Sequence, residues 1–434
     1  MSRLPRTATP PPCSLAALAL VCGACGGPPP EPDTNLLLIT IDTLRADVLQ
    51  PYGEERPTSP GLLAFSKEAV LFEEAHAVSS WTLPTLSSLH TSLLTSSHGA
   101  WTFDSRLPGS AVTLAERLLV AGYDTAAVIQ HVFLGRRYGL NQGFVHYDDE
   151  LVDDFEKSHE AITSAEVARR GLSFLTDKAD SDDERPWFLW MHFFDPHAVY
   201  QRHEEEAQLF GDSSDYELYR GEVAWTDKHL GPVLDSLGKL GLAEDTIVVV
   251  TADHGEAFEE HGVGGHGKNL YRETVRVPLM MRVPGTSARR VPDFVSMVDV
   301  KPTLLDLLGL PQPKGLAGRS LTPLIAGRPL DERPIVSELG RKQNRRSAAL
   351  IEGGYKVIWE IDAGRQQLFD LNVDRLEERD LSTQQPDRLE AMTKRLNSLR
   401  ESARKVALAD DGLGVATSDA ELKALQALGY AEDE

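Results

Sequence analysis

The segment NLLLITID, at residues 35–42, is a short apolar run that ends in an acid. Continuous apolar runs of this kind are typical of strands buried on both faces, as in a parallel sheet covered by helices. Two later segments repeat the pattern, PWFLWMHFFD at 186–195 and DTIVVVTADH at 245–254. The three runs predict a buried sheet with acidic side chains at the carboxyl ends of its strands.

The segments between these runs have apolar residues at helical spacing. Examples are LLAFSKEAVLF at 62–72, LAERLLVAG at 114–122 and GEVAWTDKHLGPVLDSLGKLG at 221–241. Strands that alternate with helices predict an α/β fold, in which a mostly parallel central sheet is sandwiched by helices. Ligands of such sheets bind at the carboxyl ends of the strands, where the acids of the three runs lie.

The pattern changes beyond residue 330. The segment RRSAALIEGGYKVIWEID, at 345–362, predicts a hairpin around Gly353 and Gly354, and a polar helix follows near 385–405. We therefore expect a large α/β domain at 35–330, which would hold the site at the strand ends. A small C-terminal α+β domain, with antiparallel strands and a helix, is expected at 331–434.

The first 34 residues are typical of an export signal and a tether. Arg3 and Arg6 precede the apolar run CSLAALALV, which is too short to span a bilayer but suits the core of a secretory signal. The next segment, CGACGGPPPEPD, resembles a lipoprotein processing site with Cys25 as the lipidated residue. We expect an exported protein, held in the periplasm or on the outer surface through Cys25. Ordinary cleavage to a secreted enzyme is the alternative.

The charge of the chain excludes some partners. Its 44 Lys and Arg against 66 Asp and Glu give a formal net charge of −22. Such a charge repels nucleic acid and anionic membrane surfaces. An anionic substrate must therefore be held by a local group of cations or by a metal ion.

Three residues at strand ends have the chemistry of metal ligands. Asp253 and His254 are adjacent at the end of one apolar run, and Asp42 ends another. A divalent cation needs deprotonated oxygen or imidazole ligands, and these side chains would meet at one edge of the sheet. A single aspartate at a strand end is more often a turn former or a cap, but the three residues together favour a metal site.

Further histidines follow the same strands. We expect His197 to lie in a turn that faces the cleft, whereas the alternation of the strand places His192 inward as a core histidine. His266 and Lys268 lie in the glycine-rich segment after His254. His261, in the same segment, is expected at the surface.

Thr82, in the segment WTLPT at 81–85, has two interpretations. Pro84 is typical of the first turn of a helix, so Thr82 would be a helix N-cap. A hydroxyl at a helix N-terminus also lies where the helix dipole favours an incoming anion and a developing alkoxide.

Residues 35–430 as a whole are similar to the sulfatase family, within the alkaline phosphatase superfamily. The matching motifs are NLLLITIDTLRADVLQPYG, WTLPTLSSLHTSLLTSSHG, MHFFDPHAVY, VTADHGEAFEEHG, HGKNLYRETVRVPLMMRVPG, VDVKPTLLDLLGLP, LFDLNVDRLEERDL and LKALQALGY.

The resemblance implies an α/β sandwich with a small C-terminal domain, and it implies roles for single residues. Asp42, Asp253 and His254 would bind a divalent metal together with Thr82, which stands at the position of the nucleophile. Four more residues fall where the family has substrate-binding and proton-transfer groups: Arg45, His197, His266 and Lys268.

This chain departs from the family in its metal ligands. Many sulfatases have paired acids where this chain has Asp42 and Thr43, and Asn where it has His254. A site with fewer carboxylates and an imidazole favours manganese or zinc. Calcium and magnesium are also divalent ions that such a site could bind.

The larger departure is at the nucleophile. Sulfatases of the usual kind convert the Cys or Ser of Cys/Ser-x-Pro-Ser-Arg into formylglycine, whereas residues 82–86 of this chain read Thr-Leu-Pro-Thr-Leu. Threonine would not yield that aldehyde, and the cysteines all lie within the first 25 residues. The threonine resembles the phosphodiesterase, phosphonate hydrolase and phosphoethanolamine transferase branches of the superfamily.

The sequence therefore predicts a metal-dependent hydrolase of sulfate or phosphate esters with Thr82 as nucleophile. Its substrate would be an anionic small molecule or a glycan ester. The family resemblance favours sulfate, and the threonine favours phosphate. A transferase and a lipoprotein that binds sulfated or phosphorylated glycans without turnover are the alternatives. The oligomeric state is not set by the sequence.

Overall fold

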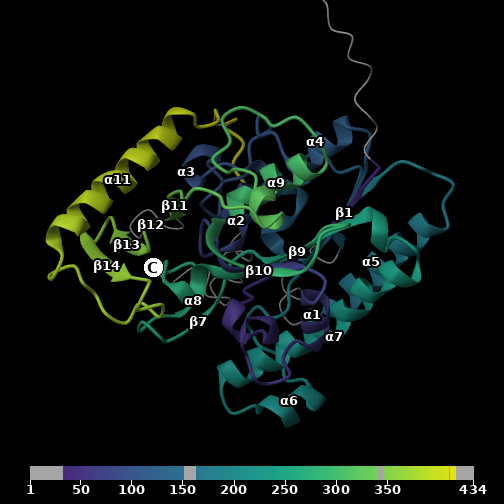
Figure 1. Cartoon of the computed structure of the whole chain (residues 1–434), viewed down its shortest axis with the longest axis horizontal. Coiled ribbons are helices and arrows are strands. Elements are labelled where there is room, and N and C mark those ends of the chain that lie inside the picture. Colours follow the sequence, from purple (N-terminus) through teal and green to yellow (C-terminus); the bar gives the residue numbers. More distant parts are fainter. Residues whose placement is uncertain (1–32, 151–162, 341–345, 410, 417–434) are drawn as a thin grey trace, which may run out of the picture. The chain divides into compact units, whose positions relative to one another are not determined.

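A computed structural model describes residues 33–150, 163–340, 346–409 and 411–416. Its main sheet has eight strands in the order β10-β2-β9-β6-β1-β5-β3-β4 (Figure 1). At its centre, β1 (Asn35–Ile41) pairs in parallel with both β5 (Trp187–Phe193) and β6 (Thr246–Ala252). The other strands are β2 (Val70–His76), β3 (Asp124–Ile129), β4 (His146–Asp148), β9 (Arg276–Arg282) and β10 (Arg289–Ser296). Since only β9 runs antiparallel to its neighbours, the mostly parallel sheet is confirmed.

The three central strands are buried on both faces, as their continuous apolar sequences require. One face is covered by α1 (Pro60–Ser66), α5 (Ser164–Ala179) and α7 (Asp215–Lys239). The other is covered by α2 (Thr82–Thr91), α4 (Leu114–Val120) and α9 (Val300–Leu307) (Figure 1). This arrangement confirms the predicted helix–sheet–helix sandwich.

One predicted helix is too long. The segment 62–72 is helical only as far as Ser66, and Val70 begins strand β2. The β-branched and aromatic residues at its end lie between β9 and β10, where they form part of the core. Burial in the sheet thus overrides the helical spacing of this segment.

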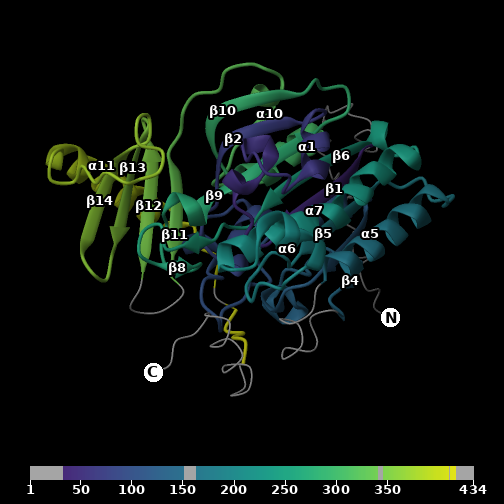
Figure 2. The same cartoon turned by 90° about the horizontal axis from the view of Figure 1, so that it is seen from below.

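A second sheet follows in the chain and is antiparallel. Its strands are β11 (Ile335–Leu339), β12 (Ser347–Glu352), β13 (Tyr355–Glu360) and β14 (Arg365–Asp370). The turn between β12 and β13 needs positive φ at Gly353 and Gly354, 62° and 72°, which glycine adopts without strain. Figure 2 shows α11 (Pro386–Lys405) beside this sheet, with which it shares a small core that includes Leu350 and Leu396. The predicted C-terminal α+β region is confirmed.

The described residues from Asp33 onward belong to one compact unit, so the domain boundary near residue 330 stays a prediction. The predicted signal segment, and Cys25 with it, lies outside the described residues. No helix in the described part of the chain combines the length and the hydrophobicity needed to cross a bilayer. The shorter elements are α3 (Thr95–His98), α6 (Glu204–Phe210), β7 (Ala257–Phe258), β8 (Gly264–Gly265), α8 (Arg272–Val275) and α10 (Thr322–Ile325).

Candidate active site

The carboxyl ends of β1 and β6 bring three predicted metal ligands together. Nε2 of His254 lies 3.6 Å from Oδ1 of Asp42 and 3.4 Å from Oδ2 of Asp253. All three side chains are fully buried. Because β1 and β6 are parallel neighbours in register, the residues that follow them leave the sheet at the same edge.

The acids of this cluster lack the partners that buried carboxylates need. Among the described residues, neither carboxylate oxygen of Asp42 has a hydrogen-bond partner, and Oδ2 of Asp253 has none. Burial, followed by the charge of Asp253, raises the pKa of Asp42 well above its usual range. Oδ1 of Asp253 accepts from the backbone N–H groups of Thr43 and His254. The three carboxylate oxygens that stay unpaired in this buried site cost free energy unless a cation offsets their charge. The residues therefore fit a bound divalent ion.

Two sets of side chains could offer ligand atoms to one ion, and both include Asp42. One is Asp42, Asp253 and His254, and the other is Asp42, His131 and His197. The imidazole tautomers distinguish them. Nδ1 of His254 lies 2.9 Å from the carbonyl oxygen of Gly255 and must donate to it, so Nε2 keeps a free lone pair.

His131 has the opposite tautomer. Its Nδ1 accepts a hydrogen bond from the backbone N–H of Phe133 at 3.1 Å, so the proton of a neutral ring is on Nε2. A protonated nitrogen cannot ligate a metal. The set with His254 is therefore the better metal site, and His131 is a hydrogen-bond donor to its neighbours.

Thr82 is the first residue of α2, and the N-cap is Trp81, so the interpretation of Thr82 as the N-cap is wrong. Its hydroxyl oxygen instead lies 3.4 Å from Nε2 of His254 and 3.5 Å from Nε2 of His131. With the tautomers above, the oxygen accepts from His131 and donates to His254. The hydroxyl is thus part of the buried cluster.

His197 and His266 complete an arc of imidazoles around this cluster. The ring of His266 lies 4.7 Å from that of His254 and 4.8 Å from that of His197. Nδ1 of His197 donates to the carbonyl oxygen of Ala198 at 2.5 Å, which fixes the orientation of its ring. The structure therefore places both predicted proton-transfer histidines near the Thr82 cluster.

Glu256 is a site residue that the sequence interpretation missed. Its carboxylate accepts hydrogen bonds from Nδ1 of His266, at 3.1 Å, and from the hydroxyl of Tyr200, at 3.1 Å. Burial raises its pKa to about 7. The side chain fixes the ring of His266 with Nε2 pointing away from Glu256, which suits an acid or base.

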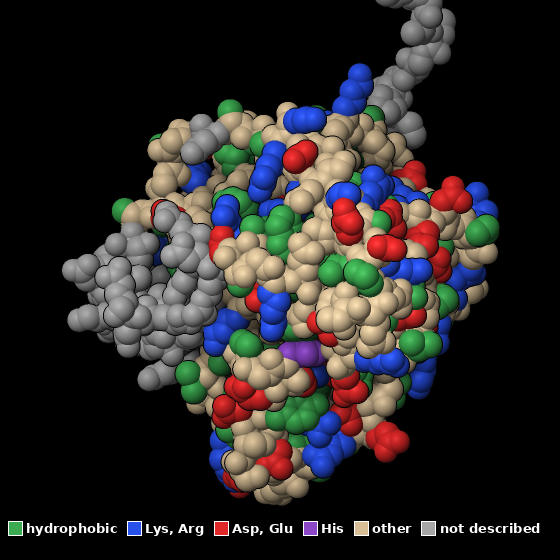
Figure 3. All heavy atoms as spheres, turned by 90° about the vertical axis from the view of Figure 1, so that its left-hand side faces the viewer, with side chains coloured by type: hydrophobic (Ala, Val, Ile, Leu, Met, Phe, Trp, Pro, Cys, Tyr) green, Lys and Arg blue, Asp and Glu red, His purple; other side chains and the backbone are tan. Residues whose placement is uncertain are grey.

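Lys268 and His266 line a cavity of about 510 Å³. Lys268 is exposed and donates from Nζ to the carbonyl oxygen of Gly264 at 2.8 Å. Aromatic rings and acids make up much of the remaining wall: Tyr200, Tyr216, Phe258, Asp215, Glu256 and Glu259. On the face of the molecule in Figure 3, acidic and basic side chains are intermingled, so a substrate anion depends on cations within the site.

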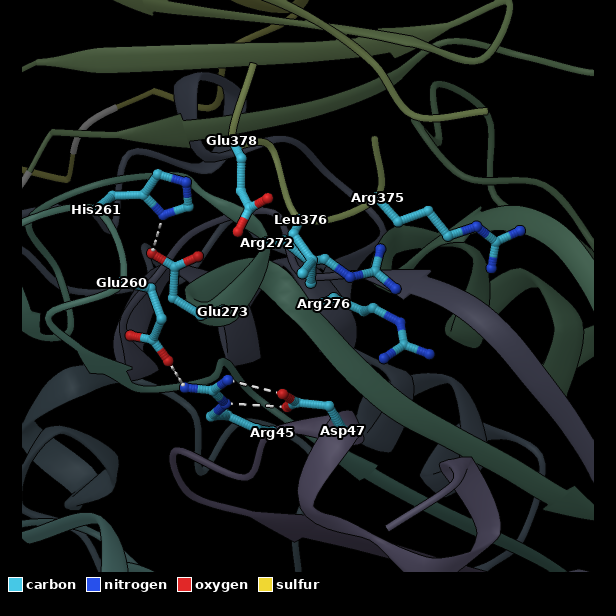
Figure 4. A pocket seen from close by; sticks show the side chains of 10 residues that line it. All are labelled: Arg45, Asp47, Glu260, His261, Arg272, Glu273, Arg276, Arg375, Leu376 and Glu378. Atoms are coloured by element: carbon cyan, nitrogen blue, oxygen red, sulfur yellow. Dashed lines mark hydrogen bonds and ion pairs between the residues drawn. The ribbon is translucent and has the colours of Figure 1, made fainter. Parts of the chain in front are cut away.

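Arg45 lies at the wall of a different cavity, of about 350 Å³, which Figure 4 shows. Its guanidinium donates two hydrogen bonds to Asp47, at 2.7 and 2.9 Å, and also binds Glu260. A third contact, at 3.1 Å, reaches the carbonyl oxygen of Glu256. In this structure Arg45 thus holds the segment that includes Glu256. Its contact with substrate stays a prediction.

Comparisons with known proteins point to one family. A family model described as Sulfatase matches residues 34–310, and one described as N-sulphoglucosamine sulphohydrolase, C-terminal, matches residues 260–403. Arylsulfatase K of Mus musculus is 36% identical over 194 residues, which cover 42% of this chain and 35% of that protein. The match thus spans about a third of arylsulfatase K. Choline-sulfatase of Rhizobium meliloti is 24% identical over 417 residues, covering 79% of this chain and 81% of the relative.

Solved structures share the fold. A phosphonate monoester hydrolase of Agrobacterium radiobacter superposes with a TM-score of 0.71 at 21% identity, covering 85% of this chain and 96% of the other. A 2-O GAG sulfatase superposes with a TM-score of 0.71 at 18% identity, covering 86% and 93%. At these identities the likeness extends to the fold alone.

Proposed function

This chain belongs to the sulfatase family, and on that premise we propose that it hydrolyses sulfate or phosphate esters with Thr82 as the nucleophile. One observation supports the proposal above all others: the Thr82 hydroxyl lies 3.4 Å from Nε2 of His254, inside a buried cluster of acids that fits a divalent ion. The substrate would be an anionic small molecule or a glycan ester. Relatives named for such substrates, choline-sulfatase and an ulvan-active sulfatase, support that class.

Four residues would hold the ion: Asp42, Asp253, His254 and Thr82. A bound divalent ion would lower the pKa of the Thr82 hydroxyl, so that its proton passes to water, and would offset the negative charge of the ester. The mixture of carboxylate, imidazole and hydroxyl donors favours manganese or zinc. Calcium prefers a larger set of oxygen ligands.

The first step forms a covalent threonyl ester. Oγ1 of Thr82 bonds to sulfur or phosphorus while the bond to the leaving oxygen breaks, and His266 gives the proton of its Nε2 to that oxygen. Glu256 favours the charged form of His266, because it accepts the hydrogen bond from Nδ1. His197 is the alternative acid.

The second step releases Thr82. His266, now neutral, removes a proton from water, and the water oxygen displaces Oγ1 from sulfur or phosphorus. A hydrogen bond from Nε2 of His131 to Oγ1 of Thr82, 3.5 Å away, would help that oxygen to leave. Lys268 adds positive charge at the cavity beside His266, where the leaving group would lie.

The proposal includes both sulfate and phosphate esters, because one observation favours each class. The family match favours a sulfuric ester hydrolase. The threonine, which cannot become formylglycine, favours a phosphodiester or a phosphonate, with transfer to an acceptor alcohol as a variant of the second step. The intact ligand set and the acid–base pair disfavour a protein that only binds glycans.

The test is elemental analysis of the purified protein together with a panel of aryl sulfates, phosphomonoesters, phosphodiesters and phosphonates. We expect one bound divalent metal and turnover of at least one class. Thr82→Ala should lose turnover by several orders of magnitude, and Thr82→Ser should keep part of it. Full activity in Thr82→Ala would remove Thr82 from the mechanism. Export and a lipid on Cys25 are separate proposals, which the mass of the mature N-terminus would test.

A further inference from the structure

His192 is buried directly behind the metal cluster, on the strand next to Asp42. It lies on β5 opposite Thr40 of β1, and Asp42 follows β1 by one residue. Nδ1 of His192 is 2.8 Å from Oγ1 of Thr40, and Nε2 of His192 is 3.5 Å from Oδ2 of Asp42. All three residues are fully buried.

A neighbouring tryptophan sets the direction of this chain of contacts. Nε1 of Trp190 can only donate, and it donates to Oγ1 of Thr40 at 2.9 Å. The Thr40 hydroxyl hydrogen then has two acceptors, Nδ1 of His192 at 2.8 Å and the carbonyl oxygen of Met191 at 3.4 Å. The shorter contact is to His192, so Nδ1 accepts and the ring proton is on Nε2.

The position of Nε2 supports the same tautomer. Nε2 lies 3.5 Å from Oδ2 of Asp42 without forming a hydrogen bond, and at this distance a lone pair on Nε2 would repel the carboxylate whereas a proton would attract it. The N–H arrangement is the favourable one.

The two oxygens of Asp42 consequently have different surroundings. Oδ2 lies near two imidazole nitrogens that carry protons, Nε2 of His192 at 3.5 Å and Nε2 of His131 at 3.4 Å, and neither contact has the geometry of a hydrogen bond. Oδ1 instead faces the free lone pair of His254 at 3.6 Å. An ion shared by Asp42 and His254 would therefore lie at Oδ1, with Oδ2 held from behind.

We propose that His192 is a positioning residue, which holds Oδ2 of Asp42 through the Trp190–Thr40–His192 relay and so presents Oδ1 to the ion. The proposal rests on the metal site of the proposed function. It differs from the expectation of a core histidine, which would have no link to the site. It also differs from a ligand role, because neither metal-binding set formed by the described residues includes His192.

Metal affinity of the stripped full-length protein, titrated calorimetrically with Mn²⁺ and Zn²⁺, tests the proposal. His192→Phe keeps a ring and removes the donor, and we expect an affinity about 10- to 100-fold weaker, as for other partners behind metal ligands. His192→Gln places an amide N–H near the position of Nε2 and should recover most of the loss. Excess metal should restore the activity of His192→Phe.

His90→Phe is the matched control. His90 is also fully buried, its ring lies 4.4 Å from that of Trp190, and no described residue bonds to its ring nitrogens. Its replacement should leave metal affinity unchanged. Equal weakening by His90→Phe and His192→Phe would overturn the proposal, since packing would then explain both.

A second variant covers the case in which His192→Phe does not fold. Thr40→Val keeps the ring and the volume but breaks the relay, so its affinity should fall, whereas Thr40→Ser should match the wild type. Wild-type metal affinity in His192→Phe would overturn the proposal and leave the proposed function intact. If His192→Phe does not fold, wild-type metal affinity in Thr40→Val would have the same meaning. A wild-type protein that binds neither metal would overturn the proposed function itself, and the role of His192 with it.

Discussion

Nδ1 of His266 lies 3.1 Å from the carboxylate of Glu256, and this pair is shielded from solvent at the inner end of the cavity that Lys268 lines. This contact fixes the orientation of the His266 ring and gives the charged ring a hydrogen-bond acceptor. We predict that Glu256→Gln lowers turnover about 10- to 100-fold for esters of alkyl alcohols, less than the ~10²- to 10⁴-fold that acid–base catalysis supplies, because His266 itself remains. Esters with acidic leaving groups, such as nitrophenol, should be much less affected, because their leaving oxygen needs no proton.

The comparison of kcat for the two ester types checks this prediction. A purely structural role for Glu256 would lower both rates equally, and that result would contradict it. Tyr200→Phe is a suitable control, because it removes the second hydrogen bond to the same carboxylate and leaves the contact with His266 in place.

The strand ends found from the sequence explain which site residues could be predicted. Asp42, Asp253 and His254 follow long apolar runs, and a buried parallel sheet places such residues at one edge. His131 lies two residues beyond β3, whose sequence DTAAVI has too few large apolar residues to stand out as a strand. The same rule would have found His131 if that strand had been recognised.

Other residues were out of reach for a different reason. Glu256 is one of several acids in the segment GEAFEE, and only the tertiary structure distinguishes the buried one. The difference between His131 and His254 depends on hydrogen bonds of their Nδ1 atoms to backbone groups. Sequence patterns contain no information on such tautomers.

The unpaired acids of the site lead to a prediction on stability. In metal-free protein, Asp42→Asn should not lower the melting temperature, because it removes a buried negative charge that no described residue hydrogen-bonds and no cation offsets. The wild type should gain stability from added metal, by about 2.7 kcal/mol when the free ion is at 100 times its Kd. Thermal melts of both proteins, with and without Mn²⁺ or Zn²⁺, check this. A metal-induced shift that survives in Asp42→Asn would contradict the assignment.

The walls of the cavity beside His266 predict a preference in the leaving group. Asp215, Glu256 and Glu259 outnumber Lys268 among its charged residues. Esters whose leaving alcohol is neutral or cationic should therefore have a higher kcat/KM than matched esters with an anionic one. Asp215→Asn and Glu259→Gln, both at exposed positions, should narrow the difference. Added salt should narrow it too. Equal rates for all three ester types in the wild type would refute this.

His261 provides the last prediction, on the pH dependence of stability. The sequence suggested a surface position, but its side chain is only 15% exposed and its ring stacks on Tyr271 at 3.8 Å. Nδ1 lies 2.9 Å from the carboxylate of Glu273, and Nε2 lies 3.1 Å from the carbonyl oxygen of Glu377. Both partners are acceptors, so the ring makes both bonds only as the imidazolium (Figure 4 shows the bond to Glu273).

Burial, the largest single effect, opposes the charge of His261, but the hydrogen bonds to Glu273 and Glu377 and the charges of these two residues together outweigh it and raise the pKa above its usual value of 6.5. A group whose pKa is higher in the folded state stabilises the fold fully below its unfolded pKa, and the contribution is lost as the pH rises through the folded pKa. The melting temperature of the wild type should therefore exceed that of His261→Gln at acidic pH. The gap should close as the pH rises past the folded pKa of His261, because the neutral ring keeps only one of its two bonds. A gap that is constant across this range would mean that stacking on Tyr271, and not the charge, accounts for the role of His261.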